Sequence, residues 1–160
     1  MKFNNISFGK KIAILLTAPI LGLLLVSLST IYTNVQTFKE MSELAQLTKL
    51  STVYSELVHE LQKERGATAG YLGSKGTKFV SKLPEQRKLT DGKIKKRNTF
   101  LTNNTFAQTQ ITALNLQLKE KLSQLSTIRQ QVDQQSIKAA KAIGFYTDLN
   151  KHITSIRAHS

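Results

Sequence analysis

Two arginines in this sequence occupy positions where a helix would normally bury apolar side chains. Residues at steps of three or four share one face of a helix. One such series contains an arginine among apolar residues: Leu57, Leu61, Arg65, Thr68 and Leu72. A second series has the same character: Ile111, Leu114, Leu118, Leu122, Leu125, Arg129 and Val132. A buried guanidinium keeps its proton, so each arginine must meet an anion.

That anion can come from the protein or from outside it. Acidic side chains could neutralise both arginines as internal ion pairs, and the candidates are Glu60, Glu64, Asp91 and Asp133. Alternatively, the two guanidinium groups converge and a small anion lies between them. A planar oxyanion suits this arrangement because the parallel N–H donors of a guanidinium can meet two of its oxygens. The residues alone leave both possibilities open.

Three further patterns carry more modest predictions. Gly66 and Gly70 lie one helical turn apart and would let a neighbouring helix approach closely, most simply as a packing notch. Arg87 and Asp91 are four apart and can form a structural ion pair within a helix, which contributes about 0.3 kcal/mol when exposed. The basic run at 93–97, which includes Arg97, is expected to be a solvated face.

The residue inventory argues against an enzyme. The chain has no cysteine, and its three histidines, His59, His152 and His159, lack the spacing of paired metal ligands. No serine lies in a GxSxG pattern, and no GxxxxGK[ST] phosphate loop is present. We therefore expect no catalytic residues, no metal and no cofactor.

The apolar periodicity predicts helices along the rest of the chain. One helix runs from Asn34 to the glycines near Gly73, and a second begins at Pro84. The TNNT cluster at 102–105 is expected to be a turn. A third helix carries the Arg129 series without a break, and residues 133–136 separate it from a fourth, whose apolar face is Ala139, Ile143, Tyr146, Leu149, Ile153 and Ile156. The predicted fold is an all-α antiparallel helical bundle.

A transmembrane helix is expected before the bundle. From Ile12 to Tyr32 the chain carries no charge, which at ~1.5 Å per residue spans a hydrocarbon core of about 30 Å. A cleaved signal peptide is the alternative, but no small-x-small cleavage site follows. The flanking lysines precede the segment, so the positive-inside rule places the amino terminus in the cytoplasm. We assign 1–11 as a cytoplasmic basic tail, 12–33 as the transmembrane helix and 34–160 as a periplasmic or extracellular domain.

Four blocks follow one another in the second part of the chain. They are HELQKERGATAGYLGSKG at 59–76, Gln86-Arg87 with Thr90-Asp91, Leu125-x3-Arg129-x2-Val132, and Ala142-Ile143-x2-Tyr146-Thr147-x2-Asn150. In order and spacing these blocks resemble the bacterial nitrate- and nitrite-sensing domain, over roughly residues 45–157. That module occurs in chemoreceptors, histidine kinases, cyclic-dinucleotide enzymes and a soluble antiterminator.

The resemblance implies an all-helical sensor that binds nitrate or nitrite and alters the activity of a downstream output region. Carried over by motif, Arg65 is the arginine of the ERG block and Arg129 that of the LxxxRxxV block, and both are expected to bind the anion. Gly66 would let the backbone come close to the ligand, and Thr68 would donate a hydroxyl. Arg87 is expected to pair with Asp91 rather than with the ligand.

The sequence also departs from the family pattern. Similar sensors continue into a second helical half with another KERAGxERA-like motif, then a second membrane helix and a signalling domain. The sequence ends at Ser160 without them. We therefore expect residues 34–160 to be the first half of the full domain, in a receptor fragment or a short protein that acts through partners.

The prediction is thus the sensor region of a bacterial inner-membrane receptor, such as a methyl-accepting chemotaxis receptor, with a small oxyanion as ligand and a homodimer as assembly. The alternative is a membrane-anchored scaffold or dimerisation bundle without a ligand. The formal charge of +13 could also attract nucleic acid. A domain outside the cytoplasm excludes that partner.

Overall fold

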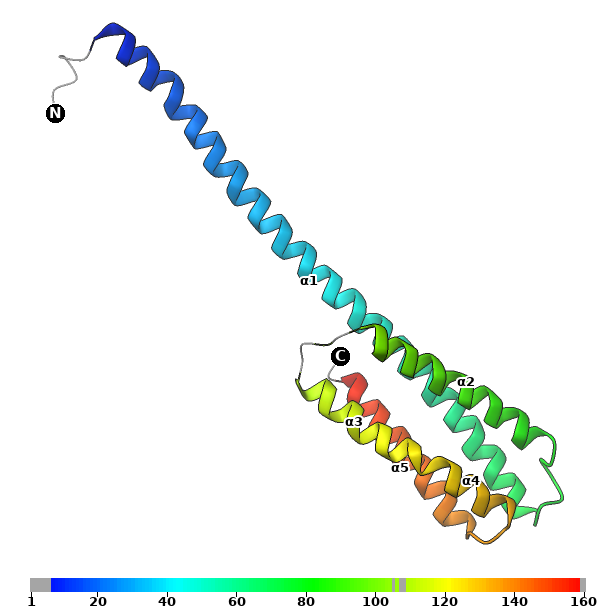
Figure 1. Ribbon diagram of the computed structural model, residues 1–160. Helices are drawn as coiled ribbons and strands as arrows, with labels where there is room; N and C mark the ends of the chain where they lie inside the picture. Colours follow the sequence, from blue (N-terminus) through cyan, green and yellow to red (C-terminus); the bar gives the residue numbers. More distant parts are fainter. Residues whose placement is uncertain (1–6, 105, 107–108, 159–160) are drawn as a thin grey trace. The chain divides into compact units, whose positions relative to one another are not determined.

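The computed structural model describes residues 7–104, 106 and 109–158, and within these it contains helices and no strand (Figure 1). The helices are α1 (Phe8–Gly73), α2 (Lys82–Asn103), α3 (Thr109–Ser123), α4 (Leu125–Asp133) and α5 (Ala139–Ala158). The all-α prediction is confirmed. The chain divides into two compact units, 1–45 and 46–160, and α1 contributes residues to both.

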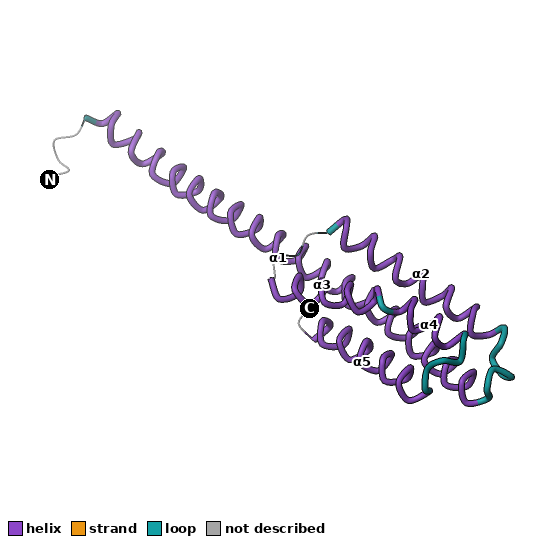
Figure 2. The backbone as a smooth tube through the Cα atoms, turned by 60° about the horizontal axis from the view of Figure 1, so that its bottom comes forward, coloured by secondary structure: helices purple, strands orange, loops and turns teal. Residues whose placement is uncertain are grey.

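The second unit is a helical bundle. The later part of α1 packs with α2, α5 and the consecutive pair α3 and α4, and short connections reverse the chain direction each time (Figures 1 and 2). Its core is formed mainly by the faces predicted from the sequence: Leu50, Tyr54, Leu57, Leu61, Ile111, Leu118, Leu125, Tyr146, Leu149, Ile153 and Ile156. A smaller apolar cluster contains Ala67, Leu83, Val132, Ile137 and Ala142.

The third predicted helix is interrupted, which the sequence prediction missed. α3 ends at Ser123 and α4 begins at Leu125. At Gln124 the backbone N–H bonds to the carbonyl of Lys121, three residues back, at 3.2 Å, so the chain tightens locally into a 3₁₀-type turn. The apolar series crosses the interruption, because both Leu118 and Leu125 remain in the core.

The connection after α1 closes with a left-handed turn. The N–H of Gly76, at φ +77°, bonds to the carbonyl of Tyr71 at 2.9 Å, which satisfies one of the last carbonyls of the helix. The ring of Phe79 then packs on Gly70, where an added Cβ would lie 2.3 Å from a ring carbon. Gly70 is therefore a packing notch, although it receives a side chain of the connection rather than a neighbouring helix.

The next connection starts slightly later than predicted. α2 continues to Asn103, and Asn104 is extended at φ −134° and ψ 131°. Of the TNNT cluster predicted to be a turn, Thr105 lies outside the described residues.

The first unit contains the charge-free segment. Within the described part of the chain, α1 is the one helix long and apolar enough to cross a membrane, and its most apolar stretch buries nothing in the structure. α1 passes from residue 33 to 34 without interruption, so the assigned border between membrane segment and domain has no structural counterpart and stays a prediction. Of the basic tail, Lys2 lies outside the described residues.

Candidate functional site

Glu64 and Arg65 are neighbours on α1 with different surroundings. Glu64 is 0% exposed, whereas Arg65 is half-buried. The buried series of α1 therefore continues from Leu61 through Glu64 to Thr68, and the predicted place of Arg65 on the apolar face is wrong by one residue. Steps of three or four allow either choice, because adjacent residues differ by only about 100° around the helix.

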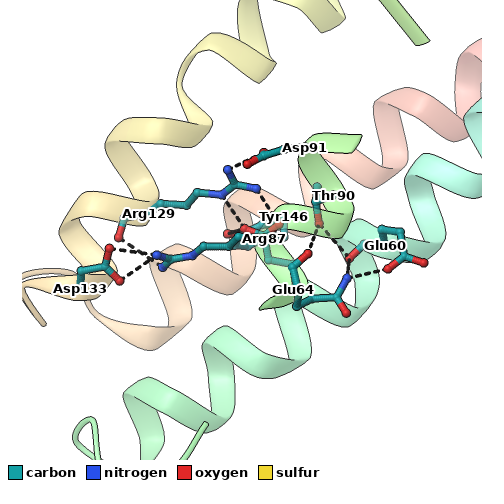
Figure 3. A network of polar contacts seen from close by, with 9 residues as sticks. Glu60, Glu64, Arg87, Thr90, Asp91, Arg129, Asp133 and Tyr146 are labelled. Atoms are coloured by element: carbon teal, nitrogen blue, oxygen red, sulfur yellow. Dashed lines mark hydrogen bonds and ion pairs between the residues drawn. The ribbon is translucent and has the colours of Figure 1, made fainter. Parts of the chain in front are cut away.

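Glu64 is the acceptor at the centre of a polar network between helices (Figure 3). Arg129 of α4 donates from Nε to Oε1 at 2.7 Å and from Nη2 to Oε2 at 2.9 Å. The hydroxyl of Tyr146, from α5, donates to Oε1 at 2.8 Å. A fully buried carboxylate is costly unless its charge is paired and its oxygens are bonded, and here both conditions are met.

Arg129 has a second carboxylate partner. Its Nη1 donates to Oδ1 of Asp91, on α2, at 2.7 Å. Burial acts to lower the pKa of the Arg129 guanidinium, but the hydrogen bonds and charges of Glu64 and Asp91 outweigh it and raise the pKa above its ordinary value. For Arg129, the internal ion pair is therefore the alternative that the structure contains.

Tyr146 is held in its neutral form. Burial is the largest cause that raises the pKa of its phenol, and the charge and hydrogen bond of Glu64 raise it further. The hydroxyl consequently keeps the proton that it donates to Glu64.

The predicted pair of Arg87 with Asp91 is wrong. Arg87 crosses from α2 to α4 and donates from Nη1 to both carboxylate oxygens of Asp133, at 2.8 and 2.9 Å. Its Nη2 reaches the carbonyl of Arg129 at 3.4 Å. Both oxygens of Asp133 accept from Arg87, whereas Asp91 accepts from Arg129, so two contacts between helices replace one within a helix (Figure 3).

Arg65 has no carboxylate partner among the described residues. Its Nη1 donates to Oγ1 of Thr147, on α5, at 3.2 Å, and it takes part in none of the ion pairs of the described chain. The charge of Arg65 thus has no counter-charge among the described residues, whereas Arg129 has two. Arg65 and Arg129 share no hydrogen-bond partner among the described residues, and the convergence of their guanidinium groups around one anion stays a prediction.

Gly66 is accessible from the surface of the protein, whereas Thr68 is not. Gly66 is exposed, and a Cβ added there would meet nothing within 4 Å, so its backbone faces open space. Thr68 is fully buried, and its hydroxyl lies near the phenol of Tyr146 without a hydrogen bond of good geometry to any described residue. A ligand at the surface could reach the first residue but not the second without a rearrangement.

Residues 56–159 match the profile of a family described as nitrate and nitrite sensing. The chain belongs to this family. A similar solved structure is that of the NasR transcription antiterminator, with a TM-score of 0.70 and 27% sequence identity over 74% of this chain. The match spans 32% of the NasR chain, about a third of its length. A search of curated proteins found no match.

In this nitrate and nitrite sensing domain, the four sequence blocks lie on four helices that meet around Glu64. The first block contributes Glu64 itself, the second Asp91 and the third Arg129. The fourth contributes both Tyr146, bonded to Glu64, and Thr147, bonded to Arg65. The order of the blocks thus corresponds to one polar assembly.

Glu60, named from the sequence as a possible partner of the two arginines, is a second buried acid of the domain and has other partners. Glu60 is 8% exposed and accepts from Nε2 of Gln86 at 2.6 Å, while Thr90 donates to its carbonyl at 3.4 Å. The hydrogen bond from Gln86 is the largest cause that lowers the pKa of Glu60. The steps of four from Glu60 to Glu64 and from Glu64 to Thr68 place all three residues on one buried face of α1.

Arg97 corrects the prediction of a solvated basic face. It is 2% exposed, while its neighbours Lys93 and Lys96 do reach the surface and bind Glu56. The hydrophobicity of the sequence does not show which of the four basic residues is buried, because all four are strongly polar.

Proposed function

We propose that this chain is the ligand-binding region of a membrane signalling receptor and that nitrate or nitrite binds at Arg65. Membership of the nitrate and nitrite sensing family supports the ligand class. One observation supports the residue: Arg65 is half-buried, carries a charge that no described carboxylate balances, and adjoins the open backbone of Gly66. A planar oxyanion would accept two parallel N–H groups of this guanidinium.

The other proposed ligand residues have different roles in this mechanism. Gly66 leaves room for the anion next to Arg65. Arg129 orients Glu64 in the conformation described, and contacts the anion only if its carboxylates release it. Thr68 is beneath the surface and is available to a ligand only after the same rearrangement.

The relay starts from two neighbouring contacts between α1 and α5. Arg65 bonds Thr147, and the adjacent Glu64 bonds the adjacent Tyr146. An anion that takes over the guanidinium of Arg65 competes with Thr147 and changes how α1 rests on α5. Because α1 continues from this site to Phe8, a change in its position reaches the N-terminal segment.

The cellular setting belongs to the same proposal. The charge-free segment crosses the inner membrane once, with the amino terminus in the cytoplasm and the helical domain outside, as in a chemoreceptor. A homodimer is the proposed assembly.

The test is thermal unfolding of the full chain in detergent with nitrate, nitrite, chloride and sulfate at matched ionic strength. A ligand that binds only the folded state stabilises it by RT ln(1 + [L]/Kd), about 2.7 kcal/mol at 100 times Kd. We expect nitrate or nitrite to raise Tm above the chloride value, and the rise to vanish in Arg65→Ala.

Two variants control this experiment. Lys95→Ala removes an exposed charge elsewhere and should keep the full response. Arg65→Lys keeps the positive charge but loses the parallel N–H donors of the guanidinium. Its Tm should therefore rise less with nitrate or nitrite than that of the native chain. Equal response of all variants to all salts would refute the proposal, because it would reflect screening of a basic surface.

The scaffold alternative is favoured by one observation, the complete internal pairing of Arg129 with Glu64 and Asp91. A scaffold predicts no difference between nitrate and chloride in any variant. The same melting series therefore separates the two functions.

A further inference from the structure

We propose a second anion site in the bundle, built around Arg97, that binds a small organic carboxylate. Arg97 is the largest of the fully buried side chains, with 2% of the residue exposed. Unlike Arg129, it forms no ion pair with any described residue. This guanidinium is buried without a counter-charge, which a bound anion would supply.

Neutral groups hold the guanidinium in place. Its Nη2 donates to the backbone carbonyl and to Oδ1 of Asn115, both at 3.1 Å, and its Nη1 donates to Oδ1 of Asn98 at 3.0 Å. Its Nε donates to the hydroxyl of Tyr54 at 3.4 Å. These four bonds use four of the five N–H donors, so one N–H on Nη1 remains for a ligand.

Tyr54 does not provide the missing negative charge. Burial is the largest cause of a raised pKa for its phenol, and it outweighs the opposing effect of Arg97. The hydroxyl also bonds to Asn115, so this residue completes the neutral cradle.

A surface pocket of about 670 Å³ opens beside Arg97, between α2 and α3. Among the described residues, its wall contains no acidic side chain but includes a second cation, Lys119, which forms no ion pair with them. The wall of the pocket also contains three apolar side chains, those of Leu101, Ala113 and Leu116. The volume is large for a three-oxygen anion, and the apolar wall suits a ligand with a carbon body.

This pocket is distinct from the site proposed at Arg65. Arg97 contacts α1 at Tyr54, which is eleven residues before Arg65 in the same helix, a rise of about 16 Å. The two sites therefore predict separable ligand responses. A carboxylate at Arg97 would join α2 to α3, because the residues that surround it come from both helices.

The test uses succinate and acetate as probes on the full chain in detergent, with sodium chloride at the same ionic strength as reference. We expect either carboxylate to raise Tm above the chloride value. In Lys119→Ala the affinity from a titration of Tm should fall by about fivefold, the size expected for a single exposed charge. Lys95→Ala, the same charge change on α2 outside this pocket, should respond like the native chain.

A second variant introduces a carboxylate side chain of the protein at the pocket, in place of the ligand. Leu116 is 69% exposed, so Leu116→Glu should fold, bring a carboxylate to the pocket and abolish the response to both probes. Nitrate stabilisation should persist in Lys119→Ala and Leu116→Glu, and should be lost only in Arg65→Ala.

Three results would overturn the proposal. They are a carboxylate response no larger than that of chloride, a response equal in all four chains, and loss of the nitrate response in the Lys119 variant, which would make the two sites one. Failure of nitrate alone would instead refute the function proposed for Arg65 and leave the Arg97 site standing.

Discussion

Three donated hydrogen bonds, from residues on α4 and α5, end on the carboxylate of Glu64. Its charge is stable there because Arg129 matches both oxygens, and the neutral phenol of Tyr146 adds a donor without adding charge. Arg65, one residue later, has no such partner. Two successive residues of α1 thus differ in their surroundings: the carboxylate of Glu64 is paired, whereas the guanidinium of Arg65 has no counter-charge among the described residues.

We expect Arg129→Ala to destabilise the bundle by about 3–5 kcal/mol, because it leaves the buried charge of Glu64 without its cation. Urea unfolding of the full chain in detergent measures this. Asp91→Asn is the control: the Asp91 side chain is 56% exposed, so its loss should cost less than about 1 kcal/mol. Equal effects of the two variants would contradict the central role assigned to Glu64.

We expect Glu60 to make part of the free energy of unfolding sensitive to acid. In the folded protein, the hydrogen bond from Gln86 lowers the pKa of Glu60 below the ordinary value for a glutamate, which is about 4.3. Such a group stabilises the fold above its unfolded pKa, and that stability is lost as pH falls through the folded pKa. We therefore expect Glu60→Gln to flatten the pH dependence of Tm below about pH 4.3. An unchanged slope would show that other carboxylates govern acid unfolding.

At the scale of the helix, α1 contains two glycines with opposite constraints. Gly70 touches the ring of Phe79, so Gly70→Ala must displace that ring and should lower Tm. Gly66 meets open space, so Gly66→Ala should stabilise the helix by about 0.5–1 kcal/mol. Circular dichroism melts compare the two variants directly, and a matched loss in both would contradict the geometry.

The Gly66→Ala variant also tests the ligand site. If the anion needs the open backbone beside Arg65, the added methyl group should weaken the nitrate response while Tm without nitrate rises. A nitrate response that stays at the native level would remove Gly66 from the proposed site.

Periodicity predicted the helices well because burial repeats with the turn of the helix, and most of the predicted apolar faces form the core. It could not decide between Glu64 and Arg65, since both fit steps of three or four. The partners of Arg87 and Asp91 depend on which helices adjoin, which is a tertiary property. Arg97 was missed for the same reason, because its cradle comes from Tyr54 and Asn115 on two other helices. The interruption at Gln124 has no glycine or proline to mark it.

At the scale of the whole chain, the proposed topology can be tested with introduced thiols, because the native sequence has no cysteine. Ser7 and Lys88 are exposed on either side of the charge-free segment in sequence. In cells with a permeabilised outer membrane and an intact inner membrane, a membrane-impermeant thiol reagent should label Lys88→Cys and should not label Ser7→Cys. Labelling of both or the reverse pattern would contradict the orientation, and lysed cells provide the control for reactivity.

The buried position of Glu64 also limits the motions available to α1. Turning the helix about its own axis by one residue, about 100°, would withdraw the carboxylate from Arg129 and bring Arg65 toward that cation. Like charges would then face each other in the bundle interior, so the packing opposes rotation more than sliding or tilting. We therefore expect Glu64 to resist rotation of α1, and we expect the relay proposed above to use a small axial shift or a change of tilt of this helix.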